Sequence, residues 1–341
     1  MKNISMRTNQ LFIGFFFFCI MVFLFRDLHA EPGNSLPEEE SLIVENVSIG
    51  GNSITDVYGN VLGATIPLKR AGRLFVMEGT VNGVTGNFIL DTGASGLVLN
   101  KTYFRNSIVV DDEEGGGVTG STGTIERIHV VKMMISDLTY NNIAADVTSL
   151  GHLENRRGVK ILGLFGMSLL QQIEMVVDFR NNELQVYKVD KNGNRAGQKS
   201  PEVKFDVIGK ISIYRNILFV KAEIGGKELD FCLDTGAESN ILHSGAPKQA
   251  LNTVTITRRS SLRGAGPDKG EILIGTLSEF RFGNQQLGPM ETAVYSLTAM
   301  SRKYGCPIDG MLGYDFFMKG KIFINLIKKE MGICLKTEEK P

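Results

Sequence analysis

Short apolar runs that end at glycine-bearing turns recur along the chain. Residues 73–81 and 216–224 are two such runs, and each is followed by a turn that contains glycine. Phe88-Ile89-Leu90 and Phe231-Cys232-Leu233 are uninterrupted apolar triplets of the length expected for short buried strands. Because apolar runs bounded by turn residues are typical of strands, the pattern predicts a largely β-stranded protein.

The remaining regular segments agree with that prediction. Residues 175–179 and 322–326 are further apolar strand candidates, whereas a helical pattern is found only around 168–172 and 315–318. Glycine accounts for 39 of the 341 residues, more than its usual share, which suits many turns between short strands. We therefore expect an all-β fold with few, short helices.

The chain contains an internal duplication. Residues 81–95 (VNGVTGNFILDTGAS) align without gaps with residues 224–238 (IGGKELDFCLDTGAE) at an offset of 143. A second pair of blocks aligns at an offset of 147 and contains Leu164-Phe165-Gly166 in one copy and Met311-Leu312-Gly313 in the other. Each copy is about 140 residues long, the size of a domain, so the sequence predicts two homologous domains.

The duplication and the local composition divide the chain into five parts. We expect a signal peptide or N-terminal anchor over residues 1–30, an N-terminal extension over 31–64, a first lobe over 65–190, a linker over 191–203 and a second lobe over 204–337. The linker region is polar and has the composition of a solvated connection.

The N-terminal segment has the organisation of an export signal. Lys2 and Arg7 precede an unbroken apolar run over residues 11–25. A membrane-spanning helix needs about 20 apolar residues, so this 15-residue run is short for a permanent span and is typical of a signal-peptide core. We expect export, and both cleavage after Ala30 and retention as a membrane anchor through residues 11–25 remain open.

Composition excludes several functional classes. Basic and acidic residues balance at 37 each, so the positive field needed for nucleic-acid binding is lacking. Hydrophobic residues make up 43% and charged residues 22%, which excludes wholesale disorder and a polytopic membrane protein. The sequence contains neither a CxxC nor an HExxH motif and its histidines are isolated, so we expect no metal and no other cofactor.

The repeated Asp-Thr-Gly triplet carries the candidate chemistry. Each copy follows an apolar strand that places the carboxylate in a poorly hydrated position, where ionisation is costly. A single triplet would be interpreted as a turn, but one in each homologous domain predicts that Asp91 and Asp234 meet on a pseudo-two-fold axis. Two carboxyls that close share a proton, so one can act as a base on water while the other polarises a carbonyl.

The residues around the triplets have supporting roles in this interpretation. Gly93 and Gly236 allow the backbone to turn sharply after each Asp. Thr92 and Thr235 bring hydroxyls that can bond to the backbone or to each other.

These motifs resemble the pepsin/retropepsin superfamily of aspartic proteases, and most closely its retropepsin-like branch in a single-chain, duplicated form found in bacterial exported proteins. Asp91-Thr92-Gly93-Ala94 and Asp234-Thr235-Gly236-Ala237 match the block that supplies the catalytic Asp. Gly166 and Gly313 end the hydrophobic-hydrophobic-Gly block that packs beside it in this family. The resemblance covers residues 65–188 and 205–336.

The resemblance implies two retropepsin-like β-barrel lobes related by a pseudo-two-fold axis. It also implies an aspartic endopeptidase with Asp91 and Asp234 as catalytic residues, a polypeptide substrate, and a location in the periplasm or cell envelope. We expect an active monomer, since the duplication supplies both Asp motifs in one chain. The alternative is a catalytically weak peptide-binding scaffold with the same fold, although neither Asp is lost. A serine hydrolase is disfavoured because the sequence lacks a Gly-x-Ser-x-Gly motif.

Members of this family close a β-hairpin flap over the substrate. The glycine-rich segments 115–123 and 264–270 lie where a retropepsin flap is expected, although neither carries the Tyr found on a pepsin flap. Ordinary surface hairpins are the alternative. The flap interpretation assigns substrate contacts to Gly117, Val118, Thr119 and Gly120 in the first lobe and to Gly264, Ala265 and Gly266 in the second.

The residue after Asp-Thr-Gly bears on the working pH. Pepsin-like enzymes often have Ser or Thr there, whose hydroxyl can stabilise the charged carboxylate, whereas Ala94 and Ala237 cannot donate a hydrogen bond from their side chains. We therefore expect the carboxyl pair to keep its shared proton into mildly acidic or near-neutral conditions.

Overall fold

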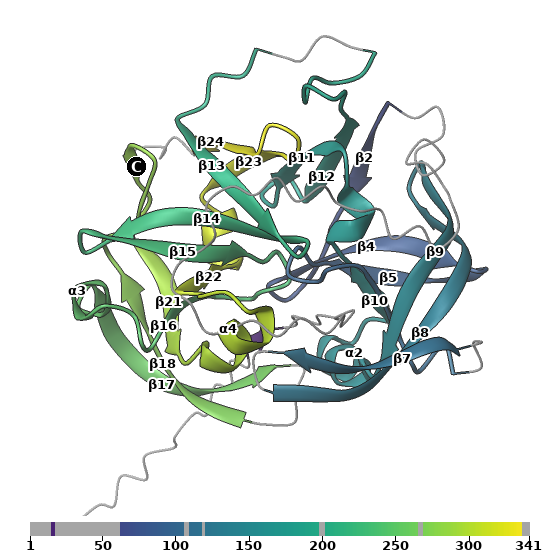
Figure 1. The fold of residues 1–341 in the computed structure, drawn as a ribbon, viewed down its shortest axis with the longest axis horizontal. Helices are drawn as coiled ribbons and strands as arrows, with labels where there is room; N and C mark the ends of the chain where they lie inside the picture. The colour runs from purple at the N-terminus through teal and green to yellow at the C-terminus, as the bar shows by residue number, and fades with distance from the viewer. Residues whose placement is uncertain are drawn as a thin grey trace, which may run out of the picture.

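The structure is a computed structural model of the chain, and it describes residues 15–17, 62–105, 109–117, 120–197, 202–264 and 269–335. Within these residues the predicted all-β, two-lobed fold is confirmed. The first lobe lies on the right in Figure 1 and the second on the left, and a sheet with strands from both crosses the top of the view.

The first lobe is built around a closed six-stranded barrel. Its elements are β3 (Lys69–Ala71), β4 (Leu74–Val81), β5 (Val84–Leu90), β6 (Leu97–Asn100), β7 (Val109–Gly117), β8 (Gly120–Ile135), β9 (Leu138–Thr148), α2 (Gly151–Arg157), β10 (Ile161–Phe165) and the 3-10 turn η1 (Met167–Leu170). The barrel strands pair in the order β4-β5-β10-β6-β9-β8, and β8 returns to pair with β4.

The second lobe repeats this order with one difference. Its elements are β14 (Ile217–Ile224), β15 (Lys227–Leu233), β16 (Asn240–His243), α3 (Lys248–Leu251), β17 (Val254–Gly264), β18 (Lys269–Leu277), β19 (Arg281–Phe282), β20 (Gln285–Gln286), β21 (Met290–Tyr295), α4 (Thr298–Tyr304), β22 (Gly310–Leu312) and α5 (Tyr314–Phe317). The strands pair in the order β14-β15-β22-β16-β21-β18. Strand β18 ends before it reaches β14, and the next strand, the short β19, pairs back to β14 instead.

A six-stranded antiparallel sheet joins the lobes. Its strands are, in order, β2 (Gly63–Pro67), β12 (Glu183–Lys188), β11 (Ile173–Asp178), β23 (Gly320–Asn325), β24 (Glu330–Leu335) and β13 (Val207–Tyr214). At its centre Met175 pairs with Ile324, Val176 with Phe323, and Val177 with Ile322. The offset of 147 makes Met175 equivalent to Ile322 and Val177 to Ile324, so the pairing is symmetric and the pseudo-two-fold axis passes between Val176 and Phe323.

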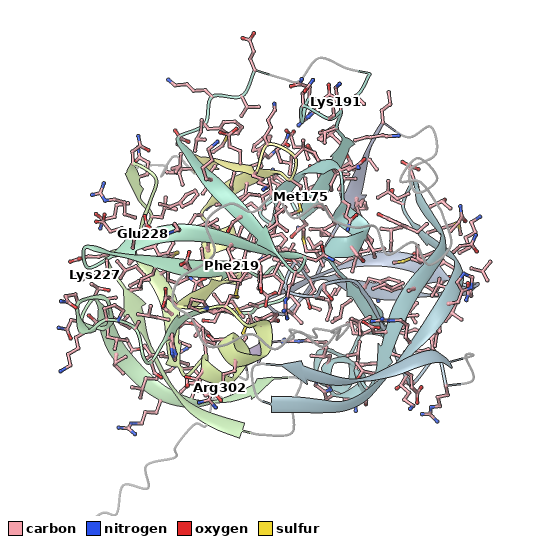
Figure 2. The ribbon with its side chains drawn as sticks, in the orientation of Figure 1. Met175, Lys191, Phe219, Lys227, Glu228 and Arg302 are labelled. Carbon is pink, nitrogen blue, oxygen red and sulfur yellow. The ribbon has the colours of Figure 1, made fainter. Side chains whose placement is uncertain are left out.

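The apolar core follows the same symmetry. One cluster under α2 and one under α4 contain equivalent residues, among them Ala94 and Ala237 and also Leu153 and Met300. The largest cluster runs through both lobes and the shared sheet. Figure 2 shows Met175 of β11 within that sheet, whereas Lys227 and Glu228 lie at the outer edge of the second lobe.

The structure corrects the prediction of helices. The helix expected over 168–172 is the 3-10 turn η1, and the one expected over 315–318 is α5, shifted by one residue. The additional helices α2, α3 and α4 were not predicted. They have four to seven residues, so fewer than two full turns are available to display an apolar periodicity.

The N-terminal segment lies almost wholly outside the described residues. Phe15–Phe17 form β1, which pairs in parallel with Leu262–Gly264 of β17. None of the helices in the described ranges is long and apolar enough to cross a membrane. Cleavage, anchoring and export therefore stay predictions.

Candidate active site

Asp91 and Asp234 each follow the last residue of a buried barrel strand. In the first lobe β5 runs parallel to β10, and the Asp91 N–H donates to Phe165 O at 3.1 Å. In the second lobe β15 runs parallel to β22, and the Asp234 N–H donates to Leu312 O at 2.9 Å. Both Asp residues are completely buried. The hydrophobic-hydrophobic-Gly block therefore fixes the backbone at the start of each Asp-Thr-Gly loop.

The two carboxyls lie at the contact between the lobes, each against the opposite loop. A Cβ atom placed on Gly93 would come within 2.6 Å of Asp234 Cγ, and one placed on Gly236 within 2.7 Å of Asp91 Cγ. Contacts this short are not sustained by carbon atoms, so only glycine allows each carboxyl to approach the other loop. The structure thus brings the two predicted Asp residues together with their glycines.

The two Thr side chains bond the loops to each other across the lobes. Thr92 Oγ1 donates to Leu233 O at 2.8 Å and accepts from the Thr235 N–H at 3.1 Å. Thr235 Oγ1 donates to Leu90 O at 2.9 Å and accepts from the Thr92 N–H at 3.0 Å. These four buried hydrogen bonds are related by the pseudo-two-fold symmetry, so they hold the two loops in one fixed relative position.

The inner oxygen of each carboxyl is held by backbone donors. Asp91 Oδ1 accepts from the Gly93 N–H at 2.9 Å and the Ala94 N–H at 3.1 Å. Asp234 Oδ1 accepts from the Gly236 N–H at 2.8 Å. Within the described part of the chain, no group donates a hydrogen bond to the outer oxygens, Asp91 Oδ2 and Asp234 Oδ2. A proton held between the two carboxyls is the donor that can serve them.

The electrostatics of the site favour retention of that proton. Burial, followed by the neighbouring Asp234 carboxyl, raises the pKa of Asp91 well above its ordinary value, and the Gly93 and Ala94 amides oppose this rise. Burial also raises the pKa of Asp234, against the effects of Asp91 and of backbone amides. Because the two groups interact this closely, the raised pKa values belong to the pair.

The second glycine block packs directly behind the Asp loops. A Cβ atom on Gly166 would lie 2.6 Å from Ala94 O, and one on Gly313 would lie 2.6 Å from Ala237 O. The second loop has an additional support, because the Gly313 N–H donates to Asn240 Oδ1 at 2.9 Å. Both glycines therefore lie directly behind the Asp loops, where a side chain would overlap the loop backbone.

The predicted flaps coincide with two long β-hairpins. The first is formed by β7 and β8, and Gly117 pairs with Gly120 at its end. The second is formed by β17 and β18, and Gly264 is the last residue of β17. The four remaining flap residues lie outside the described residues: Val118, Thr119, Ala265 and Gly266. Contact of either hairpin with a substrate stays a prediction.

Sequence reasoning missed an ionic network behind the second Asp loop. Arg157 forms an ion pair with Glu238, and Arg73 forms one with Asp315 at 3.1 Å. The only sequence signal for this network lies in the duplication itself, because Glu238 occupies the position of Ser95 in the first copy. The arginines have no local signal, since their partners are far away in the sequence.

The fold and the site define an aspartic peptidase: two homologous β lobes, each of which presents one buried Asp-Thr-Gly loop at the contact between them. An aspartyl protease family model matches the chain twice, over residues 77–169 and 220–316, and the two matches together span more than half of it. The chain therefore belongs to the aspartyl protease family.

Two solved structures illustrate the similarity. A retropepsin-like aspartic protease from Rickettsia conorii is 23% identical, with a TM-score of 0.28, and the match covers 37% of this chain and 90% of that one. An aspartic proteinase from Irpex lacteus is 12% identical, with a TM-score of 0.48, and the match covers 81% of this chain and 98% of that one. A search of curated proteins finds no significant match.

Proposed function

We propose that the protein is an aspartic endopeptidase that hydrolyses peptide bonds with a water molecule activated between Asp91 and Asp234. The observation that supports this most strongly is the pair of buried carboxyls facing each other across the lobes, each held through Oδ1 by backbone amides. Burial raises the pKa of both carboxyls, and the Asp234 carboxyl adds to the rise at Asp91, so the pair holds one proton and one charge, as the reaction requires.

The proposed reaction needs no covalent intermediate. The charged carboxylate takes a proton from water as the water oxygen bonds to the scissile carbonyl carbon, while the protonated carboxyl donates its proton to the carbonyl oxygen. The tetrahedral intermediate then collapses: the C–N bond breaks, the leaving nitrogen receives a proton from the pair, and a hydroxyl of the intermediate returns one proton to the pair. Rigidity of the loops, which the four Thr hydrogen bonds provide, keeps both carboxyls aligned during these steps.

We propose further that the substrate is an extended polypeptide bound between the lobes, under the two hairpins, and that the exported protein acts as a monomer. One chain carries both Asp loops, so the activity per molecule should not change on dilution. A steep loss of specific activity on dilution, accompanied by a fall in size measured by light scattering, would contradict the monomer.

The central test is the loss of activity when either carboxyl is replaced by an amide. Purified Asp91→Asn and Asp234→Asn should each hydrolyse a denatured protein or a peptide library at least 10³-fold more slowly than wild type, because each lacks the shared proton or the base. Asp146→Asn is the matched control, since Asp146 is also a buried Asp of the first lobe but pairs with Arg127. It should retain wild-type activity.

The outcomes separate the two candidate functions. Hydrolysis that a pepstatin-type inhibitor blocks and that both active-site variants lose supports the endopeptidase. Comparable hydrolysis by either single Asn variant would exclude the carboxyl pair as the catalyst. Tight inhibitor binding without hydrolysis by the wild type would instead indicate the peptide-binding scaffold.

A further inference from the structure

An ionic network connects the first lobe to the loop that carries Asp234. Arg157, the last residue of α2, donates from Nη2 to Glu238 Oε1, and both side chains are almost completely buried, at 10% and 4% exposed. Arg73, between β3 and β4, donates from Nη1 to Glu238 O and to Asp315 Oδ2, both at 3.1 Å. Two arginines of one lobe thus bind a single residue of the other.

The bound residue lies within the catalytic loop. Glu238 is four residues after Asp234 and directly follows Ala237, whose carbonyl accepts the Tyr314 N–H at 2.9 Å. The second lobe therefore supports the loop from one side, and the arginines of the first lobe hold it from the other. A shift of Glu238 is transmitted to Asp234 through only three intervening residues.

Among the described residues, this network is not repeated on the other side of the pseudo-two-fold axis. With offsets of 143 for the first blocks and 147 for the second, the equivalent positions can be read directly from the sequence. Glu238, Arg157, Arg73 and Asp315 correspond to Ser95, Tyr304, Asn216 and Ser168, respectively. None of these four counterparts is an acidic or basic residue, so these positions cannot repeat the network beside the first Asp loop.

The burial of this ion pair needs an explanation other than stability. A buried pair must overcome the desolvation of both ions, so such a pair often contributes little to the free energy of folding, although loss of one partner leaves a buried charge uncompensated. What the pair does supply is a charge-assisted, directional contact. Here that contact fixes one catalytic loop against the opposite lobe.

We propose that Arg157, assisted by Arg73, is a positioning residue that aligns Asp234 with Asp91 by holding Glu238, and that the enzyme depends on this contact on one side of the site only. The proposal rests on the proposed endopeptidase function. Neither arginine contacts the carboxyl pair in the described structure, so both act through Glu238.

The test compares two buried ion pairs. Arg157→Met, Glu238→Gln and the double variant remove the Arg157–Glu238 ion pair and leave the Arg73 contacts in place, and Arg157→Lys is the conservative variant. Arg195→Met and Glu174→Gln are matched controls, because Arg195 and Glu174, which lies in β11 of the shared sheet, form a similarly buried pair at 2.6 Å. Turnover is measured per site titrated with a pepstatin-type inhibitor, which makes the result independent of the folded fraction.

We expect Arg157→Met and Glu238→Gln each to lower kcat by about 10- to 100-fold with little change in KM, because misplacement of a catalytic group by about 1 Å costs up to about 100-fold. The double variant should lose no more than either single variant, since the pair acts as a unit. Arg157→Lys should recover part of the loss. The control variants should lose thermal stability but keep the wild-type kcat.

A second measurement does not depend on turnover. The two titration steps of the Asp91–Asp234 pair, followed by 13C NMR and assigned with the Asn variants, should draw closer together in Glu238→Gln. The upper step, in which the shared proton is lost, should move to lower pH because the two carboxyls separate. Unchanged titration and unchanged kcat per site in the folded variants would overturn the positioning role. If the wild type hydrolyses no peptide, the proposed function fails, and the titrations alone still decide whether Glu238 aligns the pair.

Discussion

The close approach of Gly93 to the opposite carboxyl makes a single added methyl group a sharp test of the site. In Gly93→Ala the new Cβ atom would lie 2.6 Å from Asp234 Cγ, whereas carbon atoms in contact are separated by about 3.5–4.0 Å. Relief of the overlap requires a movement of about 1 Å. Since a displacement of that size costs about 100-fold in rate, we expect kcat to fall by about two orders of magnitude.

The assay measures kcat and KM on one peptide substrate together with the thermal midpoint of unfolding. Gly236→Ala should behave in the same way, because its Cβ atom would lie 2.7 Å from Asp91 Cγ. Gly151→Ala is the control, since its Cβ atom would meet only Thr102 Oγ1 at an ordinary 3.8 Å. A folded Gly93→Ala variant with a kcat within twofold of wild type would refute the face-to-face placement of the carboxyls.

Three further predictions follow from individual contacts. Thr92→Val removes the partner of Leu233 O and of the Thr235 N–H, so chemical denaturation should show a loss of about 2–5 kcal/mol in the free energy of unfolding, which Thr92→Ser should largely restore. Burial raises the pKa of Asp315 from 3.8 to about 6, so its stabilising contribution is complete below pH 3.8 and is lost as pH rises through 6. The stability of wild type relative to Asp315→Asn should therefore fall by about 2–3 kcal/mol between pH 4 and 7, and a flat difference would contradict the shift. Ala94→Ser should move the alkaline limb of the pH–rate profile to lower pH, because a hydroxyl donor stabilises the charged carboxylate; an unmoved limb would show that the backbone amides already supply what the hydroxyl would add.

The pair of facing Asp residues could be predicted because its information is local and present twice. Asp91 and Asp234 end apolar strands and are followed by the same residues, so the duplication alone places them together on an axis. The Thr hydroxyls were expected to bond to the backbone or to each other. The structure shows that each does the first and also accepts the N–H of its counterpart.

The remaining features depend on contacts between distant residues. Arg157 and Glu238 are 81 residues apart, and nothing near either residue indicates the other. The break between β18 and β19 is equally invisible, because Leu277 and Arg281 lie in a segment whose first-lobe counterpart is one continuous strand. Such features depend on which surfaces the folded lobes bring into contact, and neither the apolar pattern nor a motif records that.

The symmetric pairing of β11 with β23 bears on the difference between this single duplicated chain and a dimer of two identical halves. Val176 and Phe323 occupy equivalent positions in the two halves of the chain. The edge of β11 could therefore pair in the same register with β11 of a second copy of its own half, and the same holds for β23. An assembly of two identical halves would have to carry every substitution on both sides of the axis. Once the halves are joined, each side can vary alone, and the arginine contacts to Glu238 with neutral residues opposite are a difference that only the joined form permits.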